Sequence, residues 1–281
     1  MNSLLKPLNL EQILLTVKHN YHDYLANNKA KLFDSIDSTN NYLLQNITDK
    51  PQKKFLCLAE MQTHGKGQRQ NTWFSPRGNI YLSLAWQFSN QLQQLSGLSL
   101  AISVAVLRAL RQFGVTNQPQ LKWPNDILYQ NKKLAGILIE TVTQSNNIYA
   151  VMGLGLNFAM STIDNSTDIT NKINIQDCKS SLIDLATIMH PTPLPSRNKL
   201  IGLIINNILD ILLIFSKHGL RDFINEWQQY NYFQDKLITV QSNDKIITGI
   251  NQGINANGEL LLKIDNNVQA IASGHIISPC N

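Results

Sequence analysis

Cysteine is scarce in this sequence of 281 residues. The three cysteines, Cys57, Cys178 and Cys280, are odd in number, lie far apart and lack the spacing of metal ligands. Such a set argues against a disulfide framework and against a zinc site. We therefore expect the chain to work in a reducing compartment, with the cytoplasm as its location.

The patterns of nucleophilic and metal-dependent catalysis are lacking as well. His64, His190, His218 and His275 have no partner at helical or strand spacing, and no Gly-x-Ser-x-Gly motif occurs. The sequence therefore gives no support for a Ser-His or Cys-His nucleophile.

Long apolar runs and strong charge are also missing. The most apolar stretch, residues 200–215, contains Asn206, Asn207 and Asp210, so it is too short and too polar for a membrane span and predicts a buried helix. The N-terminal residues do not combine a basic segment with an apolar one, so no signal peptide is expected. A net charge of +5 is too diffuse to indicate nucleic-acid binding.

What is present indicates a globular protein. An apolar fraction of 43% over 281 residues suffices for one large domain and a small one. Only one helical pattern, at Leu10, Ile13, Leu14 and Val17, precedes residue 37. Because a helix-turn-helix needs two packed helices, we expect none at this end.

Residues 122–140 carry the densest set of charged and polar candidates. Lys122 opens a Lys-Trp-Pro-Asn-Asp corner, which cannot be helical because the residue before a proline is held in extended geometry. A short hairpin follows, and Lys133 then precedes an apolar strand containing Gly136. Two lysines beside the carboxylate of Asp126 suit a phosphate ligand, although a solvated surface hairpin would carry the same charges.

A loop at residues 63–73 is the second candidate. It follows an alternating strand that ends at Gln62, and it combines two glycines with the cations Lys66 and Arg69 before Trp73. Such a loop suits phosphate, but it is neither a GxGxxG nor a Walker motif, and a solvated loop is the simpler interpretation.

Two shorter segments complete the set. Ser38 or Thr39 precedes a helical pattern and is a natural N-cap. The Gly-Leu-Gly-Leu-Asn sequence that ends at Asn157 leaves one strand face without side chains, which also suits close packing of a helix on a sheet. On the strand at residues 79–88, Tyr81 and Ser83 share a face that can line a pocket.

In this order, the segments resemble the signature of biotin–protein ligases. The matching sequences are Asp-Ser-Thr-Asn from residue 37, Gly-Lys-Gly-Gln-Arg-Gln-Asn-Thr-Trp from 65, Lys-Trp-Pro-Asn-Asp from 122, Lys-Leu-Ala-Gly-Ile-Leu-Ile-Glu from 133 and Gly-Leu-Gly-Leu-Asn from 153. The loop departs from the family pattern, since Gln68 and Asn71 stand where arginine is common and Gln70 where glycine is common. The resemblance runs from about residue 8 to the C-terminus and is to the form without an N-terminal DNA-binding domain.

The resemblance implies an α+β fold. A mixed β-sheet with helices on its faces, similar to the catalytic domain of class II aminoacyl-tRNA synthetases, is expected at residues 1–231. A small C-terminal SH3-like β-barrel is expected at residues 232–281. Strands predicted at 237–241, 246–252, 259–264 and 268–272, with turns rich in Asn and Gly, agree with the second domain.

The resemblance also implies an activity. ATP, with Mg²⁺, would activate biotin as biotinyl-5′-AMP, and the biotinyl group would pass to a lysine of a biotin carrier domain, as in acetyl-CoA carboxylase. No tightly bound prosthetic group, nucleic acid or membrane is expected, and a homodimer is an open alternative. A lipoate–protein ligase, a biotin-sensing transcriptional regulator and a carrier-binding protein without catalysis remain as alternative functions.

Residue roles follow from the same resemblance. The expected catalytic residues are Lys133, Lys122 and Asp126, with Asp126 also the candidate Mg²⁺ ligand. The expected biotin-binding residues are Ser38, Thr39, Gln62, Gly65, Tyr81, Lys133 and Gly136. The expected ATP- and adenylate-binding residues are Lys66, Arg69, Trp73, Asn125, Gly153, Gly155 and Asn157.

Overall fold

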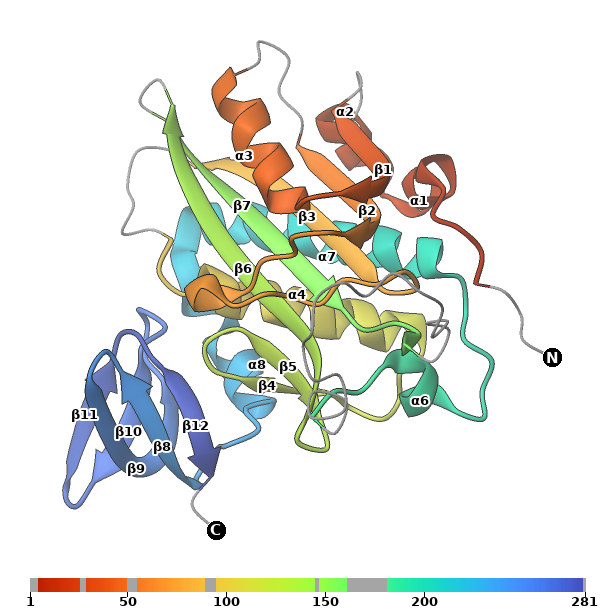
Figure 1. Cartoon of the computed structure of the whole chain (residues 1–281). Helices are drawn as coiled ribbons and strands as arrows, with labels where there is room; N and C mark the ends of the chain where they lie inside the picture. The colour runs from red at the N-terminus through yellow and green to blue at the C-terminus, as the bar shows by residue number, and fades with distance from the viewer. Residues whose placement is uncertain are drawn as a thin grey trace.

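Two β-sheets organise the chain (Figure 1). The computed structural model describes residues 5–25, 29–49, 55–88, 95–144, 147–160 and 181–279. The larger sheet has the strand order β1-β2-β3-β7-β6-β5-β4. Its strands are β1 (Ala30–Ile36), β2 (Leu56–Gln62), β3 (Ile80–Phe88), β4 (Gln120–Lys122), β5 (Asp126–Tyr129), β6 (Lys132–Gln144) and β7 (Asn147–Leu156). Only β1 and β2 pair in parallel among these described strands, so the expected mixed sheet is confirmed.

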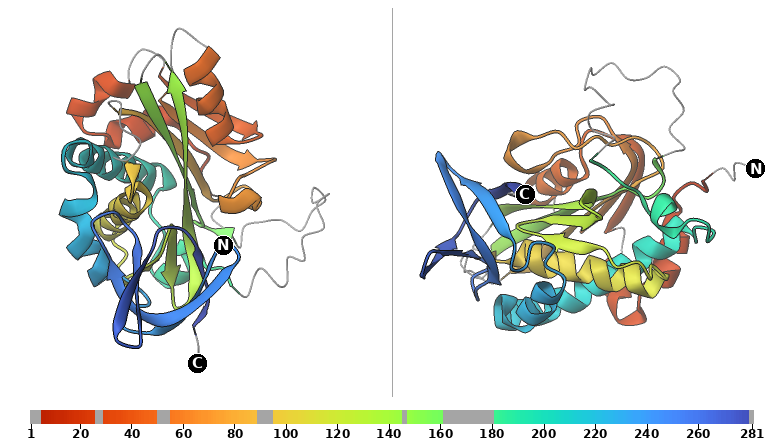
Figure 2. Two further views of the ribbon diagram at one scale, coloured as in Figure 1. Left: turned by 90° about the vertical axis from the view of Figure 1, so that its left-hand side faces the viewer. Right: turned by 90° about the horizontal axis from the view of Figure 1, so that it is seen from below.

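Helices cover both faces of this sheet (Figure 2). Helix α3 (Thr39–Asp49) packs on one face, against β2, β3, β6 and β7, and α4 (Leu98–Phe113) and α7 (Arg197–His218) pack together on the other. The remaining helical elements are α1 (Leu10–Thr16), η1 (His19–Tyr21), α2 (His22–Leu25), η2 (Gln68–Gln70), α6 (Leu185–Met189), η5 (Gly219–Phe223) and α8 (Ile224–Gln229). The architecture agrees with the predicted α+β class.

The core lies between the sheet and the α4/α7 layer. Helix α7 contains the apolar stretch noted in the sequence, and its residues Leu200, Ile201 and Leu209 are fully buried. Its length and hydropathy alone would permit a membrane span, but most of its apolar window is buried inside the protein. The C-cap of helix α4 is Gly114, whose φ of 101° is one that glycine adopts without strain.

The smaller sheet has the order β11-β10-β9-β8-β12. Its strands are β8 (Leu237–Ser242), β9 (Lys245–Ile254), β10 (Leu260–Ile264), β11 (Asn267–Ile271) and β12 (His275–Pro279). The four predicted strands are present, and β12 was not anticipated. All described strand pairings of this smaller sheet are antiparallel, which agrees with a small SH3-like domain. The domain boundary between residues 231 and 232 stays a prediction.

One local expectation was wrong. The sequence predicts Ser180 or Ser181 as the N-cap of a helix that runs through Ile188, since serine favours this position. Ser180 lies outside the described residues, and Ser181 precedes the helix by several positions. The N-cap of α6 is Asp184, whose carboxylate accepts a hydrogen bond from Thr187 N at 2.9 Å. An aspartate is as good an N-cap as a serine, so sequence preference alone could not choose between them.

Candidate active site

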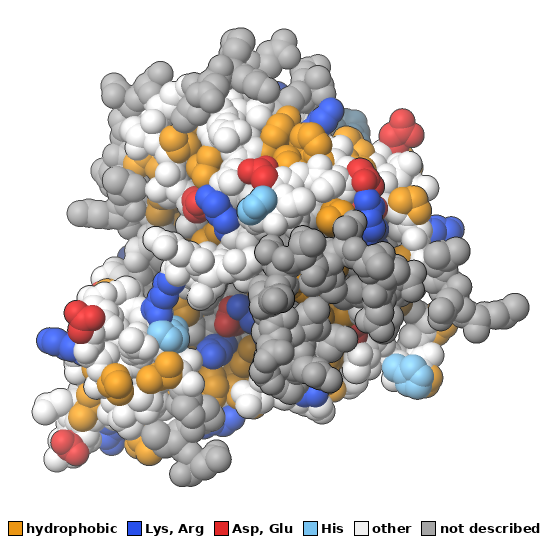
Figure 3. Space-filling model, in the orientation of Figure 1, with side chains coloured by type: hydrophobic (Ala, Val, Ile, Leu, Met, Phe, Trp, Pro, Cys, Tyr) orange, Lys and Arg blue, Asp and Glu red, His pale blue; other side chains and the backbone are white. Residues whose placement is uncertain are grey.

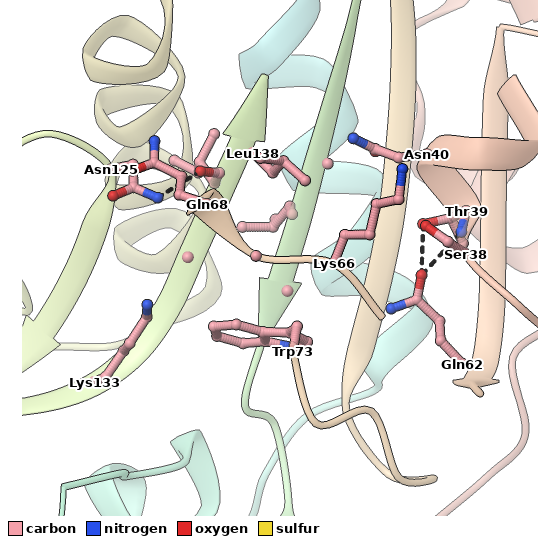
Figure 4. A pocket seen from close by; sticks show the side chains of 16 residues that line it. Ser38, Thr39, Asn40, Gln62, Lys66, Gln68, Trp73, Asn125, Lys133 and Leu138 are labelled. Atoms are coloured by element: carbon pink, nitrogen blue, oxygen red, sulfur yellow. Dashed lines mark hydrogen bonds between the residues drawn. The ribbon is translucent and has the colours of Figure 1, made fainter. Parts of the chain in front are cut away.

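A cleft opens at the ends of β2, β6 and β7, beneath the loop that follows β2 (Figure 4). The space between its walls is about 470 Å³, including open solvent at its mouth. Its lining residues are Ser38, Thr39, Asn40, Gln62, Lys66, Gly67, Gln68, Trp73, Asn125, Lys133, Gly136, Ile137, Leu138, Gly153, Leu154 and Gly155. On the face seen in Figure 3, several Lys and Arg side chains lie where the two sheets meet.

One end of the cleft is a wall of uncharged polar groups. Ser38 and Thr39, at the start of α3, are both buried. The backbone N–H of Thr39 donates to Gln62 Oε1 at 2.9 Å, and Thr39 Oγ1 lies 3.0 Å from the same oxygen. Gln62 Nε2 in turn donates to Ser75 Oγ at 2.9 Å. The end of β2, the start of α3 and the returning loop are thus held together by the predicted biotin-binding side chains.

The opposite end carries charge. Lys133 Nζ forms an ion pair with Asp126 Oδ1 at 2.7 Å, and both side chains are partly buried. Lys122 lies opposite Asp126 in the β4–β5 register. Burial lowers the pKa of Lys122, and Lys133 adds to that lowering, while Asp126 opposes it. Asn125 Nδ2 donates to Ile137 O at 2.8 Å, which ties the Trp-Pro-Asn-Asp corner to β6.

Trp73 lies between the two ends, against the glycines of β6 and β7 (Figure 4). A Cβ atom on Gly155 would come within 2.4 Å of the indole Cε2 and Nε1, and one on Gly136 within 3.0 Å of Cζ3. These glycines are therefore required for the close approach of the indole. Lys133 Nζ lies 5.0 Å from the ring centroid, within the range of a cation–π contact.

The structure brings ten of the sequence-predicted residues to the lining of this cleft. They are Ser38, Thr39, Gln62, Lys66, Trp73, Asn125, Lys133, Gly136, Gly153 and Gly155. Lys122 and Asp126 lie directly behind Lys133. Gly65 lies at the base of the loop, where a Cβ would meet Ser75 Oγ and Trp73 O at 2.4 Å. The roles assigned to all of these residues stay predictions.

Three predicted residues face elsewhere. Tyr81 is buried, and its hydroxyl donates to Pro76 O at 2.7 Å. Asn157 Nδ2 donates to Lys133 O and Ile183 O at 3.2 and 3.1 Å, so this amide supports the strand that carries Lys133. Arg69 contacts His275 on β12, away from the cleft lining.

The lining also includes residues that were not among the predicted site residues. They are Asn40, Gly67, Gln68, Ile137, Leu138 and Leu154. Most of them are neighbours of predicted residues, which is the signal that could have found them. Asn40 is 4% exposed, and a Cβ on Gly153 would lie 2.5 Å from its Oδ1, so Gly153 makes room for this side chain.

The loop over the cleft is held at its base and strained at its tip. Lys66 pairs with Thr72, and Gly67 N donates to Asn71 O at 2.7 Å. Arg69 and Gln70 have φ values of 57° and 63°, which are costly for residues with a Cβ. Gln70 stands where the related family commonly has glycine, which would adopt this φ without strain.

The described residues contain no group of three or more His, Cys, Asp or Glu side chains that could hold a metal ion. Mg²⁺ is usually bound through one or two carboxylates together with substrate phosphates. Asp126 can contribute one such oxygen only if it shares its carboxylate with Lys133. The residues present therefore fit a magnesium ion that arrives with a nucleotide, and not a dedicated protein site.

Comparisons with family models, known proteins and solved structures all give matches to one family. The Biotin/lipoate A/B protein ligase family matches residues 32–157, and the biotin protein ligase C-terminal domain matches residues 235–277. The chain is 33% identical over 243 residues to the bifunctional ligase/repressor BirA of Escherichia coli (strain K12), covering 86% of this chain and 71% of that protein. It is 32% identical over 268 residues to BirA of Salmonella typhimurium (strain LT2), covering 95% and 79%. A biotin protein ligase from Aquifex aeolicus, solved in complex with biotin and ATP, is similar in fold, with a TM-score of 0.71, 21% identity and coverage of 88% of this chain and 97% of that chain.

Proposed function

The chain belongs to the Biotin/lipoate A/B protein ligase family, and from this premise we propose how its cleft performs the reaction. The enzyme activates biotin with ATP as biotinyl-5′-AMP and transfers the biotinyl group to a protein lysine. We propose that the acceptor is a biotin carrier domain and that both steps occur in the cytoplasm. The assignment of residues to steps is likewise proposed.

One observation carries the assignment: a neutral hydrogen-bonding wall lines one end of the cleft, and Lys133, which is paired with Asp126 behind it, lines the other. Biotin has the same polarity, with an uncharged ureido ring at one end and a carboxylate at the other. The ring would lie at Ser38, Thr39 and Gln62, and the carboxylate would point to Lys133. Trp73 would then flank the ligand between the two ends.

The first step joins two anions, the biotin carboxylate and the α-phosphate of ATP. Such a step needs positive charge and fixed positions more than it needs a strong base. Lys133 would stabilise the charge that develops on the α-phosphate as pyrophosphate leaves, and Asp126 would hold the Lys133 ammonium in place. Lys122 and Lys66 would neutralise the other phosphates, and a magnesium ion bound with ATP would supply further charge there.

The second step is attack by a lysine amine on the mixed anhydride, with release of AMP. Nothing in the proposed site needs to act as a covalent nucleophile, which agrees with the lack of Ser-His and Cys-His patterns in the sequence. The cleft must instead exclude water while the anhydride waits for the carrier. The loop at residues 65–72 lies where it can do this, since Gly67 and Gln68 line the cleft.

Substrate choice is the direct test of this proposal. With biotin, ATP and Mg²⁺, we expect the purified protein to label a biotin carrier domain and to leave a lipoyl domain unlabelled. Mass spectrometry of both domains after the same incubation provides the measurement. Replacing biotin with lipoate in parallel reactions is the control, and equal labelling of the two domains would contradict the assignment.

A second expectation concerns the loop. Gln68 lines the cleft where the family commonly has arginine, so Gln68→Arg should add a charged contact to the adenylate. A contact of about 1 kcal/mol would lower the release of free biotinyl-AMP roughly fivefold. Chromatography of the free intermediate, in reactions without carrier, measures the effect.

Gln70→Arg provides a matched control for this expectation. This substitution makes the same chemical change at an exposed loop position outside the cleft lining, so it should leave the release of biotinyl-AMP unchanged. We also expect proteolysis within residues 65–72 to slow when biotin and ATP are added. Equal release from the two variants would show that charge at position 68 does not retain the intermediate.

A further inference from the structure

A continuous row of polar side chains runs behind the neutral wall of the cleft, from Glu140 on β6 to Gln62 on β2. Asn40 Nδ2 donates to Glu140 Oε2 at 2.8 Å. Ser83 Oγ lies 2.5 Å from Asn40 Oδ1 and 2.7 Å from Thr39 Oγ1. Thr39 Oγ1 lies 3.0 Å from Gln62 Oε1. Asn40, Ser83 and Thr39 are buried, so this row has little access to water.

The groups at the two ends of the row fix the orientation of the Asn40 and Gln62 amides. A carboxylate only accepts, so the amide group of Asn40 that faces Glu140 must be its NH₂. The Asn40 oxygen then faces Ser83 and takes the single hydroxyl proton of Ser83. At the other end, the backbone N–H of Thr39 requires that Gln62 present its oxygen.

A count of protons shows that the row has one donor too few. Its four contacts join Glu140 to Asn40, Asn40 to Ser83, Ser83 to Thr39 and Thr39 to Gln62. Asn40, Ser83 and Thr39 can each supply one proton along the row, which serves three contacts. The single Thr39 proton serves either Gln62 Oε1 or Ser83 Oγ, so without a ligand one of these two contacts has no proton. An N–H group that a ligand donates to the wall at Thr39 and Gln62 removes this deficit, because Thr39 can then turn its proton to Ser83.

We propose that Glu140 is a positioning residue that makes the wall at Thr39 and Gln62 accept hydrogen bonds from the ureido N–H groups of biotin. Glu140 acts through Asn40 and Ser83, and it need not touch biotin. This inference rests on the proposed placement of the ureido ring at Thr39. According to this inference, a carboxylate on a neighbouring strand, Glu140, makes the wall select cyclic ligands that carry hydrogen-bond donors.

Removing the charge of Glu140 while keeping its shape should remove this preference. In Glu140→Gln, the new amide can donate to Asn40, so Asn40 can turn and donate to Ser83. Ser83 then donates to Thr39 and Thr39 to Gln62, and all four contacts have a proton without a ligand. Because a ligand N–H then meets fewer free acceptors, we expect the Kd for biotin, measured calorimetrically without ATP, to rise roughly tenfold.

A second role of Glu140 must be separated from the first. Glu140 Oε1 lies 3.3 Å from Lys66 Nζ, so its loss also changes the charge at the loop. Ser83→Ala distinguishes the two roles, because it interrupts the row without touching the ion pair. If Glu140 acts through the row, Ser83→Ala should itself weaken biotin, and adding Glu140→Gln to it should weaken biotin no further. An equal effect of Glu140→Gln with and without Ser83 would overturn the proposal, as would an unchanged Kd in the single variant.

Thr39→Val tests the placement of biotin separately. It should raise the Kd for biotin, and in this background Glu140→Gln should again add nothing, which provides a second cycle if Ser83→Ala proves unstable to heat. An unchanged Kd in Thr39→Val would overturn both the placement and the proposal. A raised Kd in Thr39→Val, together with an unchanged Kd in the single variant Glu140→Gln, would overturn the role of Glu140 alone. A kcat near the wild-type value at saturating biotin, with KM raised, is expected for Glu140→Gln, because the affected contacts lie at the ring and not at the carboxylate.

Discussion

Lys133→Ala is expected to lower the rate of biotinyl-AMP formation by about 10²–10³, the usual cost of removing a preorganised group that stabilises transition-state charge. Lys133 Nζ points into the cleft beside Trp73 and is held by Asp126 at 2.7 Å. Alanine would remove the positive charge nearest the proposed meeting point of the carboxylate and the α-phosphate. Pyrophosphate release at saturating biotin and ATP measures the loss.

The neighbouring lysine offers a matched control. Lys132 lies next to Lys133 on β6 but is exposed, so Lys132→Ala should leave adenylation unchanged. Loss of the half-buried Lys133–Asp126 pair should cost only about 1 kcal/mol of stability, because Asp126 would still have Lys122 opposite it. Near wild-type pyrophosphate release from folded Lys133→Ala would show that Lys133 does not serve the chemical step.

The sequence was sufficient for the elements that follow a simple periodicity. Strand β3 repeats apolar residues at the spacing of a strand, and it was predicted within a few residues, at 79–88. Strand β12 was missed for a physical reason. It is an edge strand of five residues that ends in Pro279 and pairs only with β8 among the described strands, so it needs no clear alternation of its own.

The candidate site likewise contains residues that the sequence could identify and residues that only the fold brings together. Residues in short motifs, such as Lys133, Gly136 and Gly155, could be found because their spacing along the chain is fixed. Asn40, Ser83 and Glu140 come from three different elements and meet only in the folded protein. Tyr81 was placed on the correct strand, but strand alternation cannot tell that its hydroxyl reaches Pro76 instead of the cleft.

A buried ion pair on the far side of β2 was not predicted from the sequence either. Arg197, at the start of α7, donates from Nη2 to Glu60 Oε2 at 2.7 Å and to Oε1 at 3.0 Å. Arg197 is 4% exposed and Glu60 is 8% exposed. Arg197 Nη1 also donates to Asn79 O at 2.9 Å, and the backbone N–H of Leu8 donates to Glu60 Oε1. One pair thus joins the N-terminal segment, β2, α7 and the residue before β3.

Arg197→Met should lower the free energy of unfolding by about 3–5 kcal/mol, because it leaves the Glu60 carboxylate buried without its partner. Urea denaturation followed by circular dichroism measures the change. Arg77→Met is the control, since its pair with Asp34 is exposed and should contribute less than about 1 kcal/mol.

The double variant Glu60→Leu/Arg197→Met separates the cost of an unpaired charge from the value of the pair itself. Taking two charges out of water offsets much of their attraction, so a buried pair often adds little beyond apolar residues of similar volume. The double variant should therefore recover a large part of the stability that Arg197→Met loses. The backbone groups of Leu8 and Asn79 would still lack their partners, so we expect recovery to be incomplete. A double variant no more stable than Arg197→Met alone would show that the cost lies in those backbone contacts, and not in an uncompensated Glu60.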